Sequence, residues 1–143
     1  MILSRSYTLD DLIASDTARQ NRVDNTPTKE VIDNLRNLAQ SILQPIADEM
    51  SFRPYVTSGY RCQALNKLVG GVPTSQHVTG CAADLRCYTN VYANHLAEFA
   101  KKMPYDQLIL EQKGNIKWIH ISWAANPRRQ LIDKWVPLPH HLI

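Results

Sequence analysis

The sequence predicts a single α+β domain in which helices pack against a small antiparallel sheet. Segments with a helical period and segments with strand alternation follow one another, without internal repeats or low-complexity tracts. A length of 143 residues fits one domain, and 44% hydrophobic with 20% charged residues is typical of a soluble globular protein. We therefore expect one domain over residues 1–143, with a core at about 7–132 and an extended C-terminal tail over 124–143.

Signals for helix starts dominate the first thirty residues. Thr8 has the position of an N-cap before two acidic residues, which predicts a short helix through about Ser15. Residues 16–25 are polar and turn-like. Thr26 then has the position of a second N-cap, with Pro27 at the first helical position, where its missing N–H is harmless.

The longest expected element is an amphipathic helix that begins after Pro27. Its apolar residues recur mostly at spacings of three and four, so that they form one buried stripe. They are Val31, Leu35, Leu38, Ile42, Leu43 and Ile46. Pro45 lacks a backbone N–H, and we expect it to kink the helix or to end it near Gln44.

The rest of the chain alternates between strands and helices. We expect a strand over 55–58, a helix over 63–69, a loop over 72–80, a strand over 81–87, a helix over 91–103 and strands over 107–112 and 116–123. In the second helix, Val91 and Leu96 are expected to face inward. Gly114-Asn115 separates the last two strands and predicts a hairpin.

Charge and the N-terminus argue against nucleic-acid and membrane partners. The net charge is only +3, and the 16 basic residues are scattered rather than clustered. The first residues contain no apolar stretch of signal-peptide or membrane-span length, so we expect synthesis in the cytoplasm and no membrane span. We also expect a monomer.

The three cysteines, Cys62, Cys81 and Cys87, are odd in number and therefore exclude a complete disulfide framework. We expect free thiols in a reducing compartment.

Three polar residues suggest a metal centre. His77 and Asp84 are seven residues apart with Gly80 between them, and His120 stands in an apolar run. Alone, each has an ordinary explanation, since a buried histidine is usually hydrogen-bonded in the core and Asp84 could cap a turn. Alternation, however, turns His120 away from the apolar face of its strand. Two imidazoles and a carboxylate suit a catalytic zinc ion, and their convergence would indicate a hydrolase.

The chain resembles the zinc D-Ala-D-Ala carboxypeptidase/endopeptidase family, and in particular its short, single-domain phage and prophage members. The resemblance covers about residues 7–132 and rests on Ser58-Gly59-Tyr60-Arg61, Asn66, Val69-Gly70-Gly71, Ser75-x-His77-x-x-Gly80-x-Ala82-x-Asp84 and Trp118-Ile119-His120-Ile121-Ser122, with weaker matches at Asp16-Thr17-Ala18 and Asp24-Asn25-Thr26-Pro27. It implies the hedgehog/D-Ala-D-Ala peptidase-like fold. It also implies Zn²⁺ held by His77, Asp84 and His120, and cleavage of peptides in bacterial peptidoglycan.

A zinc peptidase also needs a carboxylate that moves the proton of the attacking water. Many members of the resembled family place it three residues before the last histidine, where this chain has Lys117. A two-residue turn at Gly114-Asn115 would instead pair Glu111 with Trp118 and make Glu111 a diagonal neighbour of His120 on the same face. We therefore predict Glu111 as the base; the ordinary alternative is a solvated hairpin residue.

Three further residues are candidates for the substrate pocket. Arg61 has the position for binding a substrate carboxylate or an oxyanion, the role that the resemblance implies, or it forms a surface salt bridge. Ser75 either orients substrate or caps its loop, and Gln107 shares the face of Glu111.

Other residues that could belong to a site have simpler explanations. Cys81 falls on the opposite strand face from Asp84 and is expected to be structural. Tyr60, Trp118 and Trp123 fit a groove or the core equally well. Histidines 95, 140 and 141 are expected at the surface.

The sequence thus predicts a zinc metallopeptidase that acts on peptidoglycan stem peptides, as a D,D-carboxypeptidase or an endopeptidase, with a phage endolysin as one role at the cell wall. The alternative is a non-catalytic, zinc-containing cell-wall-binding or phage structural module of the same fold. Glu111 argues for the enzyme, and the scattered charge gives little support to a nucleic-acid-binding domain.

Overall fold

A five-stranded sheet in the order β1-β2-β4-β3-β5 forms the centre of the computed structural model, which describes residues 1–50 and 52–136. The strands are β1 (Tyr55–Ser58), β2 (Ala82–Arg86), β3 (Gln107–Lys113), β4 (Ile116–Ser122) and β5 (Gln130–Asp133). Neighbouring strands are antiparallel except for the parallel pair β3–β5. The predicted α+β class is confirmed, with a sheet that is mostly antiparallel.

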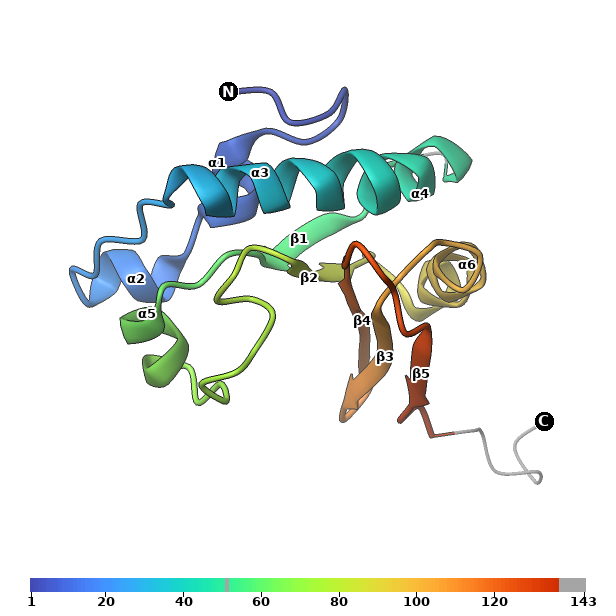
Figure 1. Cartoon of the computed structure of the whole chain (residues 1–143). Coiled ribbons are helices and arrows are strands. Elements are labelled where there is room, and N and C mark those ends of the chain that lie inside the picture. Colours follow the sequence, from blue (N-terminus) through green and yellow to red (C-terminus); the bar gives the residue numbers. More distant parts are fainter. Residues whose placement is uncertain (51, 137–143) are drawn as a thin grey trace.

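Helices pack on this sheet. They are α1 (Leu9–Ile13), α2 (Asp16–Gln20), α3 (Lys29–Leu38), the π-helical turn η1 (Ala39–Leu43), α4 (Gln44–Glu49), α5 (Gln63–Leu68) and α6 (Asn90–Ala100). Figure 1 shows α3, η1 and α4 as one continuous rod that crosses β1 and β2, with α6 beside β3 and β4. Within the described residues, none of these helices has the length and apolarity that crossing a bilayer requires.

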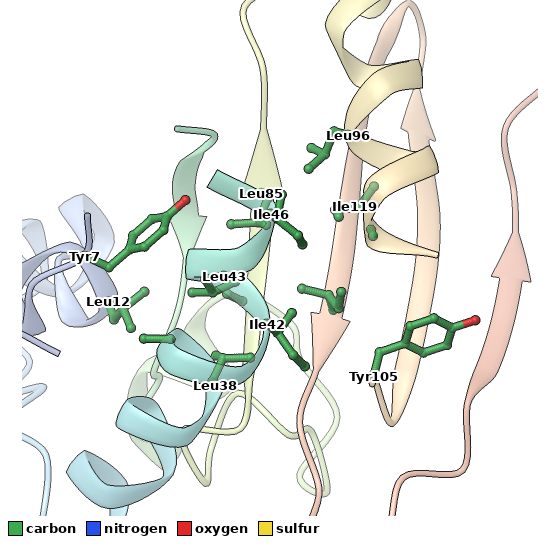
Figure 2. Packing of buried hydrophobic residues seen from close by; sticks show 14 of the residues in the cluster. Tyr7, Leu12, Leu38, Ile42, Leu43, Ile46, Leu85, Leu96, Tyr105 and Ile119 are labelled. Carbon is green, nitrogen blue, oxygen red and sulfur yellow. The ribbon is translucent and has the colours of Figure 1, made fainter. Parts of the chain in front are cut away.

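The two faces of the sheet differ in chemistry because side chains alternate along each strand. One face carries Leu85, Ile119 and Leu108, which are fully buried against the α3–η1–α4 rod and α6. Figure 2 shows the rod's apolar stripe pointing at these strands, as its period predicts. The opposite face carries Asp84 and His120. Packing of the first face therefore fixes the position of the polar residues on the second.

Of the two outcomes predicted at Pro45, a kink or an end of the helix near Gln44, the end does not occur. The chain instead widens into the π-helical turn η1 and continues as α4 to Glu49, with Pro45 in the first turn of α4. A proline lacks the N–H for the i−4 carbonyl and its ring collides with that carbonyl, and a wider turn avoids both problems. Ile42 and Ile46 consequently stay on one buried face.

Two predictions about the N-terminal half are wrong in detail. Residues 16–20 form α2 rather than a turn, because the Ser15 hydroxyl accepts from the backbone N–H of Ala18 and caps the helix. The long helix begins after Thr28, whose hydroxyl accepts from the N–H of Val31. The Thr26 hydroxyl is bound instead to the Asp24 carboxylate. The predicted cap at Thr8 is confirmed, with a complete capping box.

Part of the predicted extended tail forms a strand. Residues 130–133 add β5 to the edge of β3, and the N–H of Lys134 continues this pairing by donating to Leu110. Leu3 is 2% exposed and Trp135 packs against the core, so the core reaches beyond the predicted limits of about 7–132. Val91 is 67% exposed and does not face inward.

The remaining strands and helices lie where they are expected, within a few residues, and the hairpin pairs Lys113 with Ile116 as predicted. The three cysteines are free thiols.

Gly59, directly after β1, lies against the backbone of α1, and a substitution of Gly59 tests how tightly the two segments pack. A Cβ atom on Gly59 would lie 2.2 Å from the backbone oxygen of Leu12, so the backbone must move to accommodate it. We expect Gly59→Ala to lower the free energy of unfolding by about 1–3 kcal/mol, measured by urea denaturation. Gly114→Asn is the control, because nothing lies near its Cβ position and asparagine tolerates its positive φ. Equal stability of the two variants would contradict this packing.

Candidate metal centre

His77, Asp84 and His120 meet at the polar face of the sheet. Asp84 on β2 lies directly opposite His120 on β4 in the antiparallel register, and His77 approaches from the loop before β2. The Asp84 Oδ1 atom lies 3.1 Å from His120 Nδ1 and 3.2 Å from His77 Nε2. One ligand atom from each residue lies within 4.8 Å of the other two. Residues far apart in sequence are therefore brought to one point.

The motif Ser58-Gly59-Tyr60-Arg61 holds His77 in place. The buried His77 ring places Nδ1 2.7 Å from the carbonyl oxygen of Gly59, and the N–H of Arg61 donates to the carbonyl of His77 at 3.0 Å. A ring that donates through Nδ1 has a free lone pair on Nε2, the nitrogen that faces Asp84. The backbone after β1 thus sets both the position and the tautomer of this imidazole.

The loop between His77 and Asp84 depends on Gly80. This residue has φ +79, in the left-handed region, and a Cβ there would lie 2.9 Å from a Val31 side-chain carbon and from the Val31 carbonyl oxygen. A residue without a side chain is required for both reasons. The turn that was predicted from the spacing is therefore present, against α3.

The three side chains fit a zinc ion. Zinc bonds of about 2.0–2.1 Å in a tetrahedron put neighbouring ligand atoms about 3.3 Å apart, close to the two distances at Asp84. Burial would raise the pKa of the Asp84 carboxyl, but the neighbouring imidazoles of His120 and His77 lower it more, and this pKa lies well below its ordinary value. The carboxylate is consequently ionised, the form in which it binds a cation.

A cleft of about 550 Å³ opens directly over these three residues. All the predicted site residues line it: Arg61, Ser75, Gln107, Glu111, His77, Asp84 and His120. Trp118, for which a groove or the core was equally expected, lines it as well. The size of the cleft is within the range of small-molecule and peptide pockets. The structure thus gathers the predicted catalytic and binding candidates around one cavity.

Glu111 occupies the position expected from the hairpin register. It pairs with Trp118, while the next residue on the same face of β3, Ile109, pairs with His120. The Glu111 Oε1 atom lies 3.1 Å from Nζ of Lys134, just after β5. Lys134 was not among the predicted site residues, because the segment that carries it showed no strand pattern.

Arg61 lies partly buried at the wall of the cleft. Among the described residues, its Nε atom is buried without a hydrogen-bond partner. Burial lowers the pKa of its guanidinium, an effect that the charge of Asp84 opposes. Asn25 holds the turn that carries Arg61, since its side chain donates to the carbonyl of Tyr60 and accepts from the N–H of Cys62.

Two weaker site candidates make contacts within the protein. The Ser75 hydroxyl accepts from the N–H of His77 at 3.2 Å, so it caps the loop as well as lining the cleft. The Gln107 side chain donates to the Gln130 side chain at 2.9 Å. These contacts restrain both side chains at the edge of the cavity.

Other residues considered for the site have structural or surface positions. Burial raises the pKa of the Cys81 thiol, and Cys81 is not in the His77–Asp84–His120 group. Lys117 stacks over the ring of Trp135, Tyr60 belongs to the core, and Trp123 packs against the core. His95 is exposed as predicted; His140 and His141 lie outside the described residues.

Asp106 is a buried polar centre that sequence reasoning did not identify. Its carboxylate accepts from the Gln76 side chain at 2.9 Å and from Nη2 of Arg128 at 2.7 Å, and it also accepts from the backbone N–H of Arg128. It thereby ties the His77 loop to the segment before β5. No local signal marks these residues, because a single acid before a strand and an arginine after a proline have no characteristic period.

Acid should weaken the contact that Asp106 makes between the His77 loop and the segment before β5. Hydrogen bonds from Arg128 lower the pKa of Asp106 to about 2, below its unfolded value of 3.8. The folded-state pKa is depressed, so the stabilisation is complete above about pH 4 and is lost as the pH falls through about 2. Solvent around Arg128 screens part of the pair, and we expect about 1–2 kcal/mol. The Asp106→Asn protein should be less stable than the wild type at neutral pH. Its free energy of unfolding, measured by urea titration, should fall less between pH 4 and pH 2. An equal fall in the two proteins would contradict this prediction.

Comparison with known protein families gives one result. The Peptidase M15 family matches residues 5–122, which is most of the chain and includes the loop, strand and hairpin that carry the three metal-binding candidates. None of the curated proteins gives a significant match. The fold, the His-Asp-His group and the extent of the match agree: the chain belongs to the Peptidase M15 family, the zinc D-Ala-D-Ala carboxypeptidase-like family.

Proposed function

We propose that this protein is a zinc-dependent peptidase that hydrolyses peptide bonds in bacterial peptidoglycan stem peptides. The observation that carries the proposal is the convergence of His77, Asp84 and His120 beneath a cleft that also contains Glu111 and Arg61. Membership of the Peptidase M15 family supports the reaction class.

In this proposal His77, Asp84 and His120 hold the metal. A zinc ion at this point would lower the pKa of an attacking water and polarise the scissile carbonyl. The ligand atoms from two paired strands and one fixed loop are held in place by the sheet and by the Gly59 carbonyl. Such restraint keeps the site organised before substrate binds.

Glu111 is the proposed general base and acid. Its carboxylate would accept a proton from the attacking water and deliver it to the leaving amine. The side chain is 25% exposed, and the Lys134 ammonium contacts one oxygen and restrains its position. Arg61 would hold negative charge on the substrate or on the oxyanion through charge-assisted hydrogen bonds, since this residue lines the same cleft.

The role that we propose for this activity is degradation of the bacterial cell wall, as in phage lysis enzymes. The short, single-domain resemblance in the sequence supports it, and the cleft has room for several residues of a peptide.

Incubation of the zinc-loaded protein with purified peptidoglycan tests the proposal. We expect new peptide fragments in mass spectrometry. The fragment masses distinguish loss of a terminal D-alanine from cleavage of an internal bond. Binding to peptidoglycan without fragments would favour the non-catalytic cell-wall module, and the absence of both would reject the substrate.

A further inference from the structure

We propose that Arg128 binds a carboxylate group of the peptide substrate, at a position in the cleft separate from Arg61. This inference rests on the proposed peptidase function and assigns to Arg128 a role in substrate positioning. Arg128 lines the cleft, while one edge of its guanidinium is bound to Asp106.

The Asp106 carboxylate fixes the direction of the Arg128 side chain. Nε of Arg128 lies 3.1 Å from Oδ1 of Asp106, and Nη2 lies 2.7 Å from Oδ2. Asp106 is itself only 3% exposed, and Gln76 donates to the same Oδ2 atom at 2.9 Å. An arginine held at two points by a buried acid loses little further side-chain entropy when it binds a ligand.

The other edge of the guanidinium is available. Among residues 1–50 and 52–136, Nη1 of Arg128 makes no hydrogen bond, and 61% of the side chain is exposed. A planar guanidinium with one bound edge and one open edge is suited to a carboxylate or phosphate. The cleft of a peptidase receives peptides, so the carboxylate is the relevant ligand.

The two arginines belong to segments next to the two outermost strands of the sheet. Arg61 follows β1, the first strand in the sheet order, and Arg128 precedes β5, the last. Asp84 and His120 lie on β2 and β4 between them. A peptide that crosses the cleft would therefore meet one cation on each side of the reacting bond. The two arginines could then bind two separate carboxylates of the peptide.

Three synthetic stem peptides test the proposal: one with its internal and C-terminal carboxylates free, and two in which one of these groups is amidated. We expect Arg128→Gln to lower kcat/KM about ten- to one-hundred-fold for peptides that retain the recognised carboxylate, mainly through KM. The peptide that lacks this carboxylate should be hydrolysed at nearly the same rate by both proteins. A purely structural role would lower the rate for all three peptides equally.

Several variants keep this test independent of folding. Arg128→Gln removes the cation that pairs with the buried Asp106 carboxylate, so the double variant Arg128→Gln/Asp106→Asn should show the same selectivity with better stability. Arg128→Lys should recover part of the preference. Arg36→Gln is the matched control, because Arg36 also pairs with an aspartate, Asp33, but lies on α3 outside the cleft.

Calorimetric binding of the same peptides to zinc-loaded Glu111→Gln protein separates this proposal from the proposed function. If the wild type hydrolyses none of the peptides, the proposed function fails, while selective weakening of binding by Arg128→Gln in the Glu111→Gln background would still support the carboxylate site. Equal weakening for all three peptides, or no binding of any, would overturn the role of Arg128.

Discussion

Replacement of Glu111 by glutamine is expected to leave metal binding intact and to reduce peptide hydrolysis by about 10²–10⁴-fold. Glutamine keeps the shape of the side chain and its place opposite Trp118, but it cannot accept a proton. The loss should appear in kcat, since the proposed role of Glu111 concerns the proton of the water rather than substrate affinity. Release of fragments from peptidoglycan measures the loss of hydrolysis, and the zinc content of the same protein shows whether metal binding is intact.

Glu98→Gln provides the control for Glu111. Glu98 is an exposed glutamate on α6 that pairs with Lys101, and its loss changes the net charge by the same amount. A Glu111→Gln protein that hydrolyses peptidoglycan at a near-normal rate would show that the base lies elsewhere. A variant that loses its zinc would show instead that Glu111 belongs to the metal site.

Replacement of His77 by alanine is expected to lower zinc affinity by more than about 100-fold and to abolish hydrolysis. The substitution removes one of three ligand candidates and leaves the Gly59 carbonyl without its partner at 2.7 Å. Zinc should therefore raise the Tm of the wild type but not that of His77→Ala, because a ligand stabilises only the state that binds it. Elemental analysis and thermal melts with and without chelator measure these effects.

His95→Ala is the matched control, because His95 is exposed on α6 and lies outside the metal-binding group. It should retain about one zinc per chain and normal activity. Full metal occupancy in His77→Ala, or an active wild-type protein that contains no zinc, would contradict the metalloenzyme proposal.

Local signals predicted which residues share the polar face, because this placement follows from the alternation of side chains along each strand. A two-residue turn at Gly114-Asn115 fixes which residues pair across the hairpin, and this register alone brings Glu111 to the face of His120. The same alternation separates Asp84 from Cys81. Alternation along each strand could not give the pairing of β2 with β4, which lie far apart in the sequence. The family resemblance implied only that Asp84 and His120 share a metal ion.

The features that were missed depend on contacts between distant segments. β5 is short and pairs in parallel with β3, so neither a hairpin turn nor a regular alternation of apolar and polar residues predicts it from the sequence. Asp106 and Arg128 acquire their importance only when β5 is in place. Likewise, the persistence of the long helix past Pro45 depends on the packing of Ile46, which outweighs the local tendency to stop.

Asp84 and His120 stand on β2 and β4, each of which has a hydrogen-bonded neighbour on both sides. The apolar face beneath them is buried regardless of what the polar face holds. We therefore expect chain folding and ion uptake to be separable events, in contrast to zinc fingers, in which the ion drives folding. A chelated preparation should keep its native architecture and regain function when the cation is returned, so the loading step can be controlled without refolding the polypeptide.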